Sequence, residues 1–304
     1  MSVDDYSNHR SDPGGLAAGI GAYVVWGCFP LFFTLLDRSG AVEVLAHRVV
    51  WTFVAMFVVL VVTRRVRSLL VISPRSWLIV ASATALICLN WGTYIYAVNS
   101  GQVVECALGY FINPLVSVVF GVILFGERLR PLQVVALIVA AAAVVVITVD
   151  YGHPPVIALV LAFSFGLYGV LKKIVPLDPR TSLTAEGVVA APFALGYLIV
   201  LTVHGASTFT QFGIGYAVLL AVAGPLTAVP LLLFGVAAQR IPLSILGILQ
   251  YLTPTMQMLI GLFVLGESMT PVRWVGFGLI WVALVIFTAG SRVSRENDKV
   301  DVDK

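Results

Sequence analysis

The chain has 304 residues and a formal net charge of +3, and 60% of its residues are hydrophobic while 11% are charged. Its mean hydropathy of +1.01 excludes an ordinary water-soluble domain, because the surface of such a domain must carry more charge. No basic cluster is dense enough to favour nucleic acid as a partner. The composition therefore predicts a protein whose main solvent is the lipid bilayer.

The first 15 residues, MSVDDYSNHRSDPGG, form a polar tail without the basic start and apolar core of a secretory signal. We therefore expect the first apolar run to stay in the mature protein. Three cysteines, Cys28, Cys88 and Cys106, lie in apolar runs and match no metal-ligand spacing. We interpret them as small buried residues, and we expect no disulfide, metal site or cofactor.

Ten runs predict membrane-spanning helices, since a helix needs about 20 mostly apolar residues to cross a bilayer. Long runs without polar alternation favour helices over strands. The predicted fold class is therefore an all-α membrane protein with ten transmembrane helices. In chain order the runs cover 16–36, 42–62, 77–98, 104–125, 131–149, 155–171, 182–202, 214–238, 243–265 and 271–289.

The positive residues predict the orientation of these spans. With the N-terminus inside, 15 of the 18 Lys and Arg residues fall in the inner tails and loops. Only Arg38 and Arg273 fall in outer loops, while Arg48 lies within the second span. Because cytoplasmic loops are enriched in Lys and Arg, this asymmetry predicts a multi-pass protein of the cell membrane with both termini in the cytoplasm.

The chain also contains an internal repeat. The string FGERLRP at 125–131 returns as LGESMTP at 265–271, and at the same offset Pro114 matches Pro254. Each half holds five spans, an odd number, so the second half must enter the membrane upside down. The predicted organisation is a tail at 1–15, a first five-helix repeat at 16–149, an inverted second repeat at 155–289 and a tail at 290–304.

The repeated Gly-Glu-x-x-x-Pro pattern suits the ends of helices. The glycine closes one span, the glutamate (Glu127 or Glu267) lies among the headgroups, and the proline begins the next span, where its missing N–H costs little. A direct role of the glutamates in binding a substrate or ion is the alternative. Inverted repeats are common in secondary transporters, whose halves exchange arrangements and open a central site to alternate sides. The repeat therefore indicates transport.

Five stretches carry a resemblance to a known family: LAHRVVW (45–51), NWGTYIYAVN (90–99), LGYFINPLVSVVFGVILFGER (108–128), LAFSFGLYG (161–169) and TAVPLLLFG (227–235). They closely resemble the RarD family, in the EamA group of the drug/metabolite transporter superfamily. The resemblance covers all ten spans and implies a ten-helix bundle with cytoplasmic termini and a substrate cavity between the halves. Members are commonly labelled chloramphenicol-related permeases, which implies transport of small molecules.

The second span carries Glu43, His47 and Arg48 in its outer third. Polar groups within spans are costly and usually face the interior of the bundle. In one interpretation Arg48 reaches outward and pairs with Glu43 at the membrane interface. In the other, Arg48 binds a substrate carboxylate, while His47, which shares a helix face with Glu43, senses or carries a proton.

Further candidates for substrate binding lie in the third span and near two prolines. Pro114 and its repeat equivalent Pro254 are expected to kink their helices and to expose backbone carbonyls to a cavity. The alternative is that the nearby polar side chains form hydrogen bonds between helices and meet no ligand. The candidates are Asn90, Trp91 and Tyr94 in the third span, Tyr110 and Asn113 in the fourth, and Gln250, Tyr251, Thr253 and Gln257 in the ninth.

Two further pairs of residues have two interpretations each. Trp26 and Tyr168 begin the two halves at comparable points, and they either pack as ordinary aromatic side chains or form a stacking wall for an aromatic substrate. Glu186, at the inner end of the seventh span, and Glu105, at the outer start of the fourth, are either proton sites or interfacial carboxylates.

The favoured function is secondary transport of small organic molecules, such as drugs or amino acids, out of the cytoplasm, with coupling to protons left open. A membrane-embedded enzyme would need clustered carboxylates or a nucleophile with a base, and the longest inner loop, 64–75, contains no Asp, Glu, His or Cys. A passive channel would need an open polar lining, whereas the spans are rich in Val, Leu and Ala. The sequence leaves the oligomeric state open.

Overall fold

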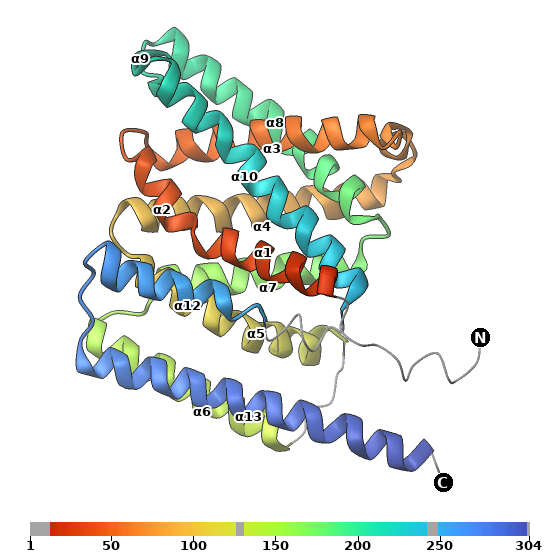
Figure 1. The fold of residues 1–304 in the computed structure, drawn as a ribbon, viewed down its shortest axis with the longest axis vertical. Coiled ribbons are helices and arrows are strands. Elements are labelled where there is room, and N and C mark those ends of the chain that lie inside the picture. Colours follow the sequence, from red (N-terminus) through yellow and green to blue (C-terminus); the bar gives the residue numbers. More distant parts are fainter. Residues whose placement is uncertain (1–12, 126–130, 242–248, 303–304) are drawn as a thin grey trace.

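A computed structural model describes residues 13–125, 131–241 and 249–302, so Glu127 lies outside the described residues. The described residues form helices and no strand, which confirms the all-helical class. The helices are α1 (Pro13–Gly27), α2 (Phe29–Phe33), η2 (Thr34–Leu36), α3 (Ala41–Val62), η3 (Val66–Val71), α4 (Pro74–Asn99), α5 (Val103–Phe125), α6 (Pro131–Tyr151), α7 (Val156–Ile174), α8 (Pro179–Val203), α9 (Thr208–Gln211), α10 (Gly213–Arg240), α12 (Leu252–Leu259), η4 (Ile260–Val264) and α13 (Pro271–Val302) (Figure 1).

Six of the described helices, α3, α4, α5, α6, α8 and α10, are long and apolar enough to cross a membrane. The bent pair formed by α1 with α2 and η2 makes a seventh candidate if it counts as one span. The other expected spans correspond to three shorter apolar segments, 156–172, 252–263 and 271–287. The count of ten crossings therefore stays a prediction.

The first expected span is broken near Pro30, where the two helices are bent by 41°. Proline has no N–H, so Pro30 cannot donate to the carbonyl of Trp26, four residues earlier. The amide Nε2 of Gln257 donates to that carbonyl instead, at 3.2 Å. A polar side chain from α12 thus completes the backbone hydrogen bonding that the proline interrupts in the first span.

The two prolines of the repeat lie in different settings, and the kinks expected at them stay predictions. Pro254 lies two residues after Leu252, where α12 begins, and therefore in a first helical turn, where no N–H is needed. Its equivalent Pro114 lies inside α5, which continues as one helix from Val103 to Phe125. The last helix, α13, also runs on to Val302, beyond the expected end at 289.

The 140-residue offset converts each main pair of packed helices into another packed pair or into itself. The offset carries α1, α3, α4, α5 and α6 onto α7, α8, α10, α12 and α13, and both α6 and α13 begin at a proline. The pair α1–α10 becomes α7–α4, and the pair α5–α7 becomes α12–α1. Three pairs, α3–α8, α5–α12 and α6–α13, map onto themselves. This packing has the pattern of a two-fold relation between the halves.

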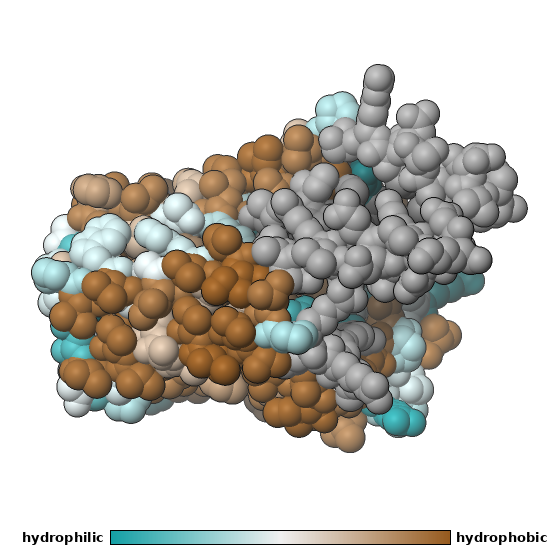
Figure 2. All heavy atoms as spheres, turned by 90° about the horizontal axis from the view of Figure 1, so that it is seen from below, coloured by the Kyte–Doolittle hydropathy of each residue, from teal (hydrophilic) through white to brown (hydrophobic). Residues whose placement is uncertain are grey.

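The outer surface of the bundle is apolar. Exposed side chains on its helices include Phe193, at 78% exposure, and Ile214, at 81%. Figure 2 shows that apolar side chains cover much of one face of the described residues. Figure 1 places the start of α1 and the end of α13 at the same end of the bundle. Contact with lipid chains accounts for this apolar exposure.

The carboxylate of Asp178 caps the start of α8. It accepts hydrogen bonds from the backbone N–H groups of Arg180 and Thr181 at 3.2 and 3.3 Å and from the Thr181 hydroxyl at 2.5 Å. Partial burial opposes ionisation, but the hydrogen bonds from Thr181 and Arg180 outweigh it and lower the pKa of Asp178. The ionised carboxylate is therefore a stabilising N-cap.

We expect Asp178→Ala to lower the free energy of unfolding by about 1 kcal/mol, because the cap is lost. Asp178→Asn, which keeps an acceptor, should lose less. A lowered pKa contributes stability above the ordinary aspartate pKa, and this contribution disappears as the pH falls through the lowered value. Thermal unfolding in detergent should therefore separate wild type from Asp178→Asn at pH 7 and not in strong acid. Identical curves for all three proteins at pH 7 would contradict the cap.

Candidate functional site

Arg48 of α3 lies in the interior of the bundle, with a side chain that is 3% exposed. Its Nε donates to the hydroxyl of Thr227 on α10 at 2.9 Å. Its guanidinium carbon lies 4.1 Å from the ring centroid of Trp91 on α4 and 5.3 Å from the rings of Phe29 and Phe33 on α2. Three other helices therefore surround this cation, and two of them, α2 and α4, present aromatic faces, which attract a positive charge.

The charge of Arg48 is not fully compensated within the described part of the chain. No described carboxylate lies within ion-pair distance of it, and its Nη1 atom has no hydrogen-bond partner among the described residues. Burying a charge without a counter-charge is costly, and aromatic contacts offset only part of that cost. The site can therefore gain from an anionic or hydrogen-bond-accepting group that enters it.

The interfacial pairing of Arg48 with Glu43 is wrong. Glu43 instead accepts hydrogen bonds from the backbone N–H of Thr208, at 2.8 Å, and from the Ser207 hydroxyl, at 3.3 Å. It thereby anchors the start of the short helix α9 to α3. His47 stacks on Phe209 of α9, with centroids 4.9 Å apart, and neither ring nitrogen has a partner among the described residues.

Three of the expected substrate ligands continue the Arg48 site toward α5. The ring of Tyr94 lies 5.9 Å from both Phe33 and Tyr110, and its buried hydroxyl has no partner in the described residues. Asn113, one turn further along α5, is buried, and its Oδ1 is likewise without a described partner.

Other expected ligands tie helices together. The amide of Asn90 donates to the Leu161 carbonyl and the Ser164 hydroxyl of α7, both at 3.0 Å. Thr253 donates to the Tyr23 carbonyl at 2.9 Å, much as Gln257 donates to Trp26. These contacts match the alternative of interhelical hydrogen bonds, although Oε1 of Gln257 has no described partner.

The remaining residues of the ninth span make fewer polar contacts. Tyr251 stacks on Phe111 of α5, with centroids 6.4 Å apart. Gln250 is half-buried just before α12. Tyr251 therefore belongs to the packing between the halves, in the α5–α12 pair.

A second polar cluster surrounds Glu186 on α8. Its carboxylate pairs with Lys172 of α7 at 2.7 Å and accepts a hydrogen bond from the Tyr168 hydroxyl at 3.1 Å. Lys172 and Glu186 also both contact the hydroxyl of Ser182. Tyr168 therefore acts as a partner of Glu186, while Trp26 packs on Tyr23 and Phe234 in a separate aromatic group.

Two more glutamates hold helix starts, as Glu43 does. Glu267 accepts hydrogen bonds from the first two backbone N–H groups of α5, at 2.6 and 2.9 Å. Glu105 accepts hydrogen bonds from N–H groups at the start of α7, at 3.0 and 3.4 Å. Carboxylates suit these positions because the first N–H groups of a helix lack internal partners. The geometry of Glu267 fits the helix-end role of the repeated pattern.

The structure also contains a cavity of about 390 Å³ between α3, α4 and α8, which we call the lateral groove. A second cavity of about 20 Å³ lies next to it and reaches Trp91 and Glu186. All three cysteines are free thiols. Cys106 is buried as expected, but Cys28 and Cys88 are half-buried, and Cys88 lines both cavities.

Sequence reasoning missed Phe29, Phe33 and Thr227, which complete the surroundings of Arg48. The phenylalanines belong to FPLFF, whose proline at position 30 was a signal that the span would break and present its side chains differently. Thr227 carried no distinct signal, since threonine is common in membrane helices and bonds its own helix here, to Ala223.

These helices and this buried aromatic and cationic site define an integral membrane protein with a polar interior. Residues 13–149 and 155–289 each match the EamA-like transporter family. The chain belongs to this family and is of the RarD type.

Relatives cover nearly the whole chain. It is 50% identical to protein RarD of Streptomyces exfoliatus over 277 residues, which are 90% of this chain and 88% of the relative. It is 44% identical to the uncharacterized transporter YojE of Bacillus subtilis over 274 residues, 88% of this chain and 91% of the relative. A solved crystal structure with 16% identity shares the fold, with a TM-score of 0.62 over 90% of this chain and 97% of that one. The chain is thus a membrane transporter.

Proposed function

We propose that the protein is a secondary active transporter that moves small organic molecules across the cell membrane by alternating access. The observation that carries the proposal is the buried Arg48, whose Nη1 has no partner among the described residues. Arg48, Trp91, Tyr94, Tyr110 and Asn113 form the proposed binding site. A substrate with an anionic or accepting group supplies the missing partner of the guanidinium.

Unequal packing of equivalent helices supports the alternating-access part. The 140-residue offset carries the α4–α8 pair onto the α10–α3 pair. At Gly224 of α10 the backbones of α10 and α3 touch, whereas Thr84, at the equivalent point of α4, lines the open lateral groove. Two equivalent contacts, one closed and one open, are what a carrier with inverted repeats exchanges during transport.

The remaining roles are part of the same proposal. The termini lie in the cytoplasm, and export is the direction. His47 is the proposed proton-coupling residue, because its ring nitrogens have no described partner, while Glu186 forms an ion pair with Lys172 that links α7 to α8. The substrates are drugs such as chloramphenicol, following the family label, or metabolites such as amino acids.

The test is counterflow in proteoliposomes, first with labelled chloramphenicol and then with a panel of amino acids, with and without a pH gradient. We expect saturable flux that internal substrate stimulates. His47→Phe keeps the stacking on Phe209 but cannot titrate, so it should lose the acceleration by the pH gradient and keep counterflow. Flux that responds neither to the gradient nor to internal substrate would indicate a channel and overturn the proposal.

A further inference from the structure

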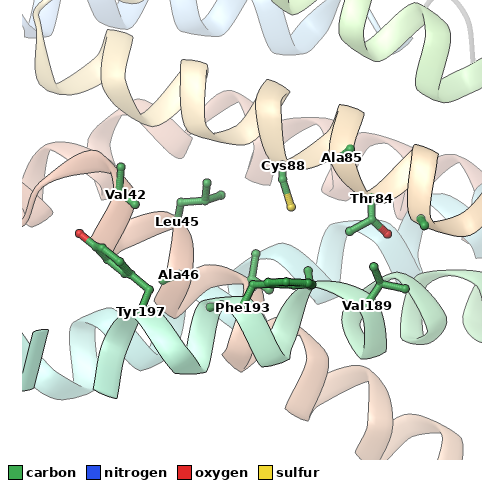
Figure 3. A pocket seen from close by; sticks show the side chains of 13 residues that line it. Val42, Leu45, Ala46, Thr84, Ala85, Cys88, Val189, Phe193 and Tyr197 are labelled. Atoms are coloured by element: carbon green, nitrogen blue, oxygen red, sulfur yellow. The ribbon is translucent and has the colours of Figure 1, made fainter. Parts of the chain in front are cut away.

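The lateral groove lies among three helices and is mostly apolar. In Figure 3, Phe193 and Tyr197 of α8 lie on one side of the gap, and Thr84 and Cys88 of α4 lie on the other. The thiol of Cys88 points into the gap toward Phe193. The volume of the groove, about 390 Å³, falls within the range of small-molecule sites, about 300–1,000 Å³.

The groove opens toward the lipid side of the bundle. Val42 of α3 is 59% exposed and Phe193 of α8 is 78% exposed, and both helices are long and apolar enough to span a membrane. Exposed apolar side chains on helices that cross a bilayer face acyl chains. A molecule that partitions into the bilayer therefore has access to the groove without first crossing water.

The groove continues inward to the proposed transport site. Val49, Thr84, Cys88 and Ala190 line both the groove and the smaller cavity, which ends at Trp91. Trp91 lies directly against Arg48. The smaller cavity, at about 20 Å³, has room for about one water molecule, so a larger group passes through it only when Trp91 or α8 moves. Such a movement belongs to a transport cycle.

The charged side chains around the smaller cavity favour an anionic group over a cationic one. Glu186, which lines the smaller cavity, is already neutralised by Lys172 at 2.7 Å. Arg48 has no described counter-charge. The interior at this point therefore carries an excess of one positive charge, which favours a negative head group and repels a cation.

We propose that the lateral groove binds the apolar body of a lipophilic monocarboxylate taken from the bilayer, with its carboxylate directed past Cys88 toward Arg48. This inference rests on the proposed function and names a substrate class for it. The apolar lining of the groove suits the apolar body, and Arg48 supplies the positive counter-charge for the carboxylate.

The test uses Cys88 as a reporter in phospholipid nanodiscs. In a Cys28→Ser, Cys106→Ala background it is the single thiol, and its alkylation by N-ethylmaleimide is followed over time. At ten times its Kd, 4-phenylbutyrate should slow labelling by about tenfold, since only unoccupied protein reacts. The neutral 4-phenylbutyramide should protect far less, and Arg48→Gln should remove the difference between acid and amide.

A groove-filling variant tests the same site in a second way. Ala190→Leu narrows the passage between the groove and the smaller cavity, so it should abolish 4-phenylbutyrate flux. The control is Leu195→Phe, at an exposed position of α8 outside the groove lining, which should leave the flux unchanged. If the acid and the amide protect Cys88 equally, the groove proposal is overturned. It is also overturned if neither protects Cys88 while chloramphenicol or amino-acid counterflow persists, and in both cases the proposed function stands. Protection by the acid without any carrier-mediated flux supports the groove and overturns the proposed function.

Discussion

Replacing Arg48 by methionine should lower carrier-mediated substrate flux by about 100-fold, equal to about 2.7 kcal/mol, because the anionic group of the substrate loses a buried charged partner. The same change should leave the unliganded protein equally or more stable, since an uncompensated buried cation is costly and methionine fills much of its volume. Arg48→Lys keeps the charge but loses the planar stacking on Trp91 and the Nε donor to Thr227, so its flux should be intermediate.

Counterflow in proteoliposomes and thermal unfolding in detergent together check this prediction. Arg38→Gln is the matched control, because Arg38 also lies over an aromatic ring, 5.0 Å from Phe212, but on the exposed surface. It should transport normally. Wild-type flux in Arg48→Met would remove Arg48 from the substrate site, whereas a large loss of stability would show that the guanidinium is structural.

The helices could be predicted because bilayer crossing imposes length and apolarity on each segment separately. Prolines at 131 and 271 mark the starts of α6 and α13, as the repeat predicted. Pro30 signals the break in the first span, but the partner of the carbonyl that it frees could not be predicted, because Gln257 lies more than 200 residues away in the sequence. Partners so distant in the chain leave no local pattern.

One feature of the site could be predicted from helix geometry alone. Glu43 and Arg48 are five residues apart, which places them about 140° apart around an α-helix. That angle disfavours the pairing that one interpretation assumed, and the structure accordingly directs Glu43 toward α9 and Arg48 toward α10. The aromatic surroundings of Arg48 depend on how four helices are rotated about their axes, which periodicity does not determine in uniformly apolar spans.

The close approach of α3 and α10 depends on Gly224. A Cβ atom at this position would lie 2.2 Å from the carbonyl carbon of Trp51 and 2.5 Å from the backbone nitrogen of Thr52. These are backbone atoms, so no side-chain rotation can relieve the clash, and the two helices would have to move apart. Glycine at such crossings allows membrane helices to pack with their backbones in contact.

Gly224→Ala should therefore lower the free energy of unfolding by about 3 kcal/mol, the upper end of ordinary overpacking costs. Gly235→Ala, on the same helix with open space around the new methyl group, should change it by less than about 0.5 kcal/mol. Thermal unfolding in detergent compares the two variants. Equal melting temperatures would show that α3 and α10 do not touch in the membrane.

The effect should extend to transport because of where this crossing lies. Arg48 precedes Trp51 by three residues and Thr227 follows Gly224 by three, so each lies about one turn from the crossing, and the Arg48–Thr227 hydrogen bond joins the same two helices. Separating the helices lengthens that bond and frees the guanidinium from its fixed orientation. We therefore expect the folded fraction of Gly224→Ala to show reduced counterflow, whereas Thr227→Val, which removes the acceptor without moving α10, isolates the contribution of the hydrogen bond. Normal flux in both variants would mean that substrate binding does not depend on how Arg48 is held.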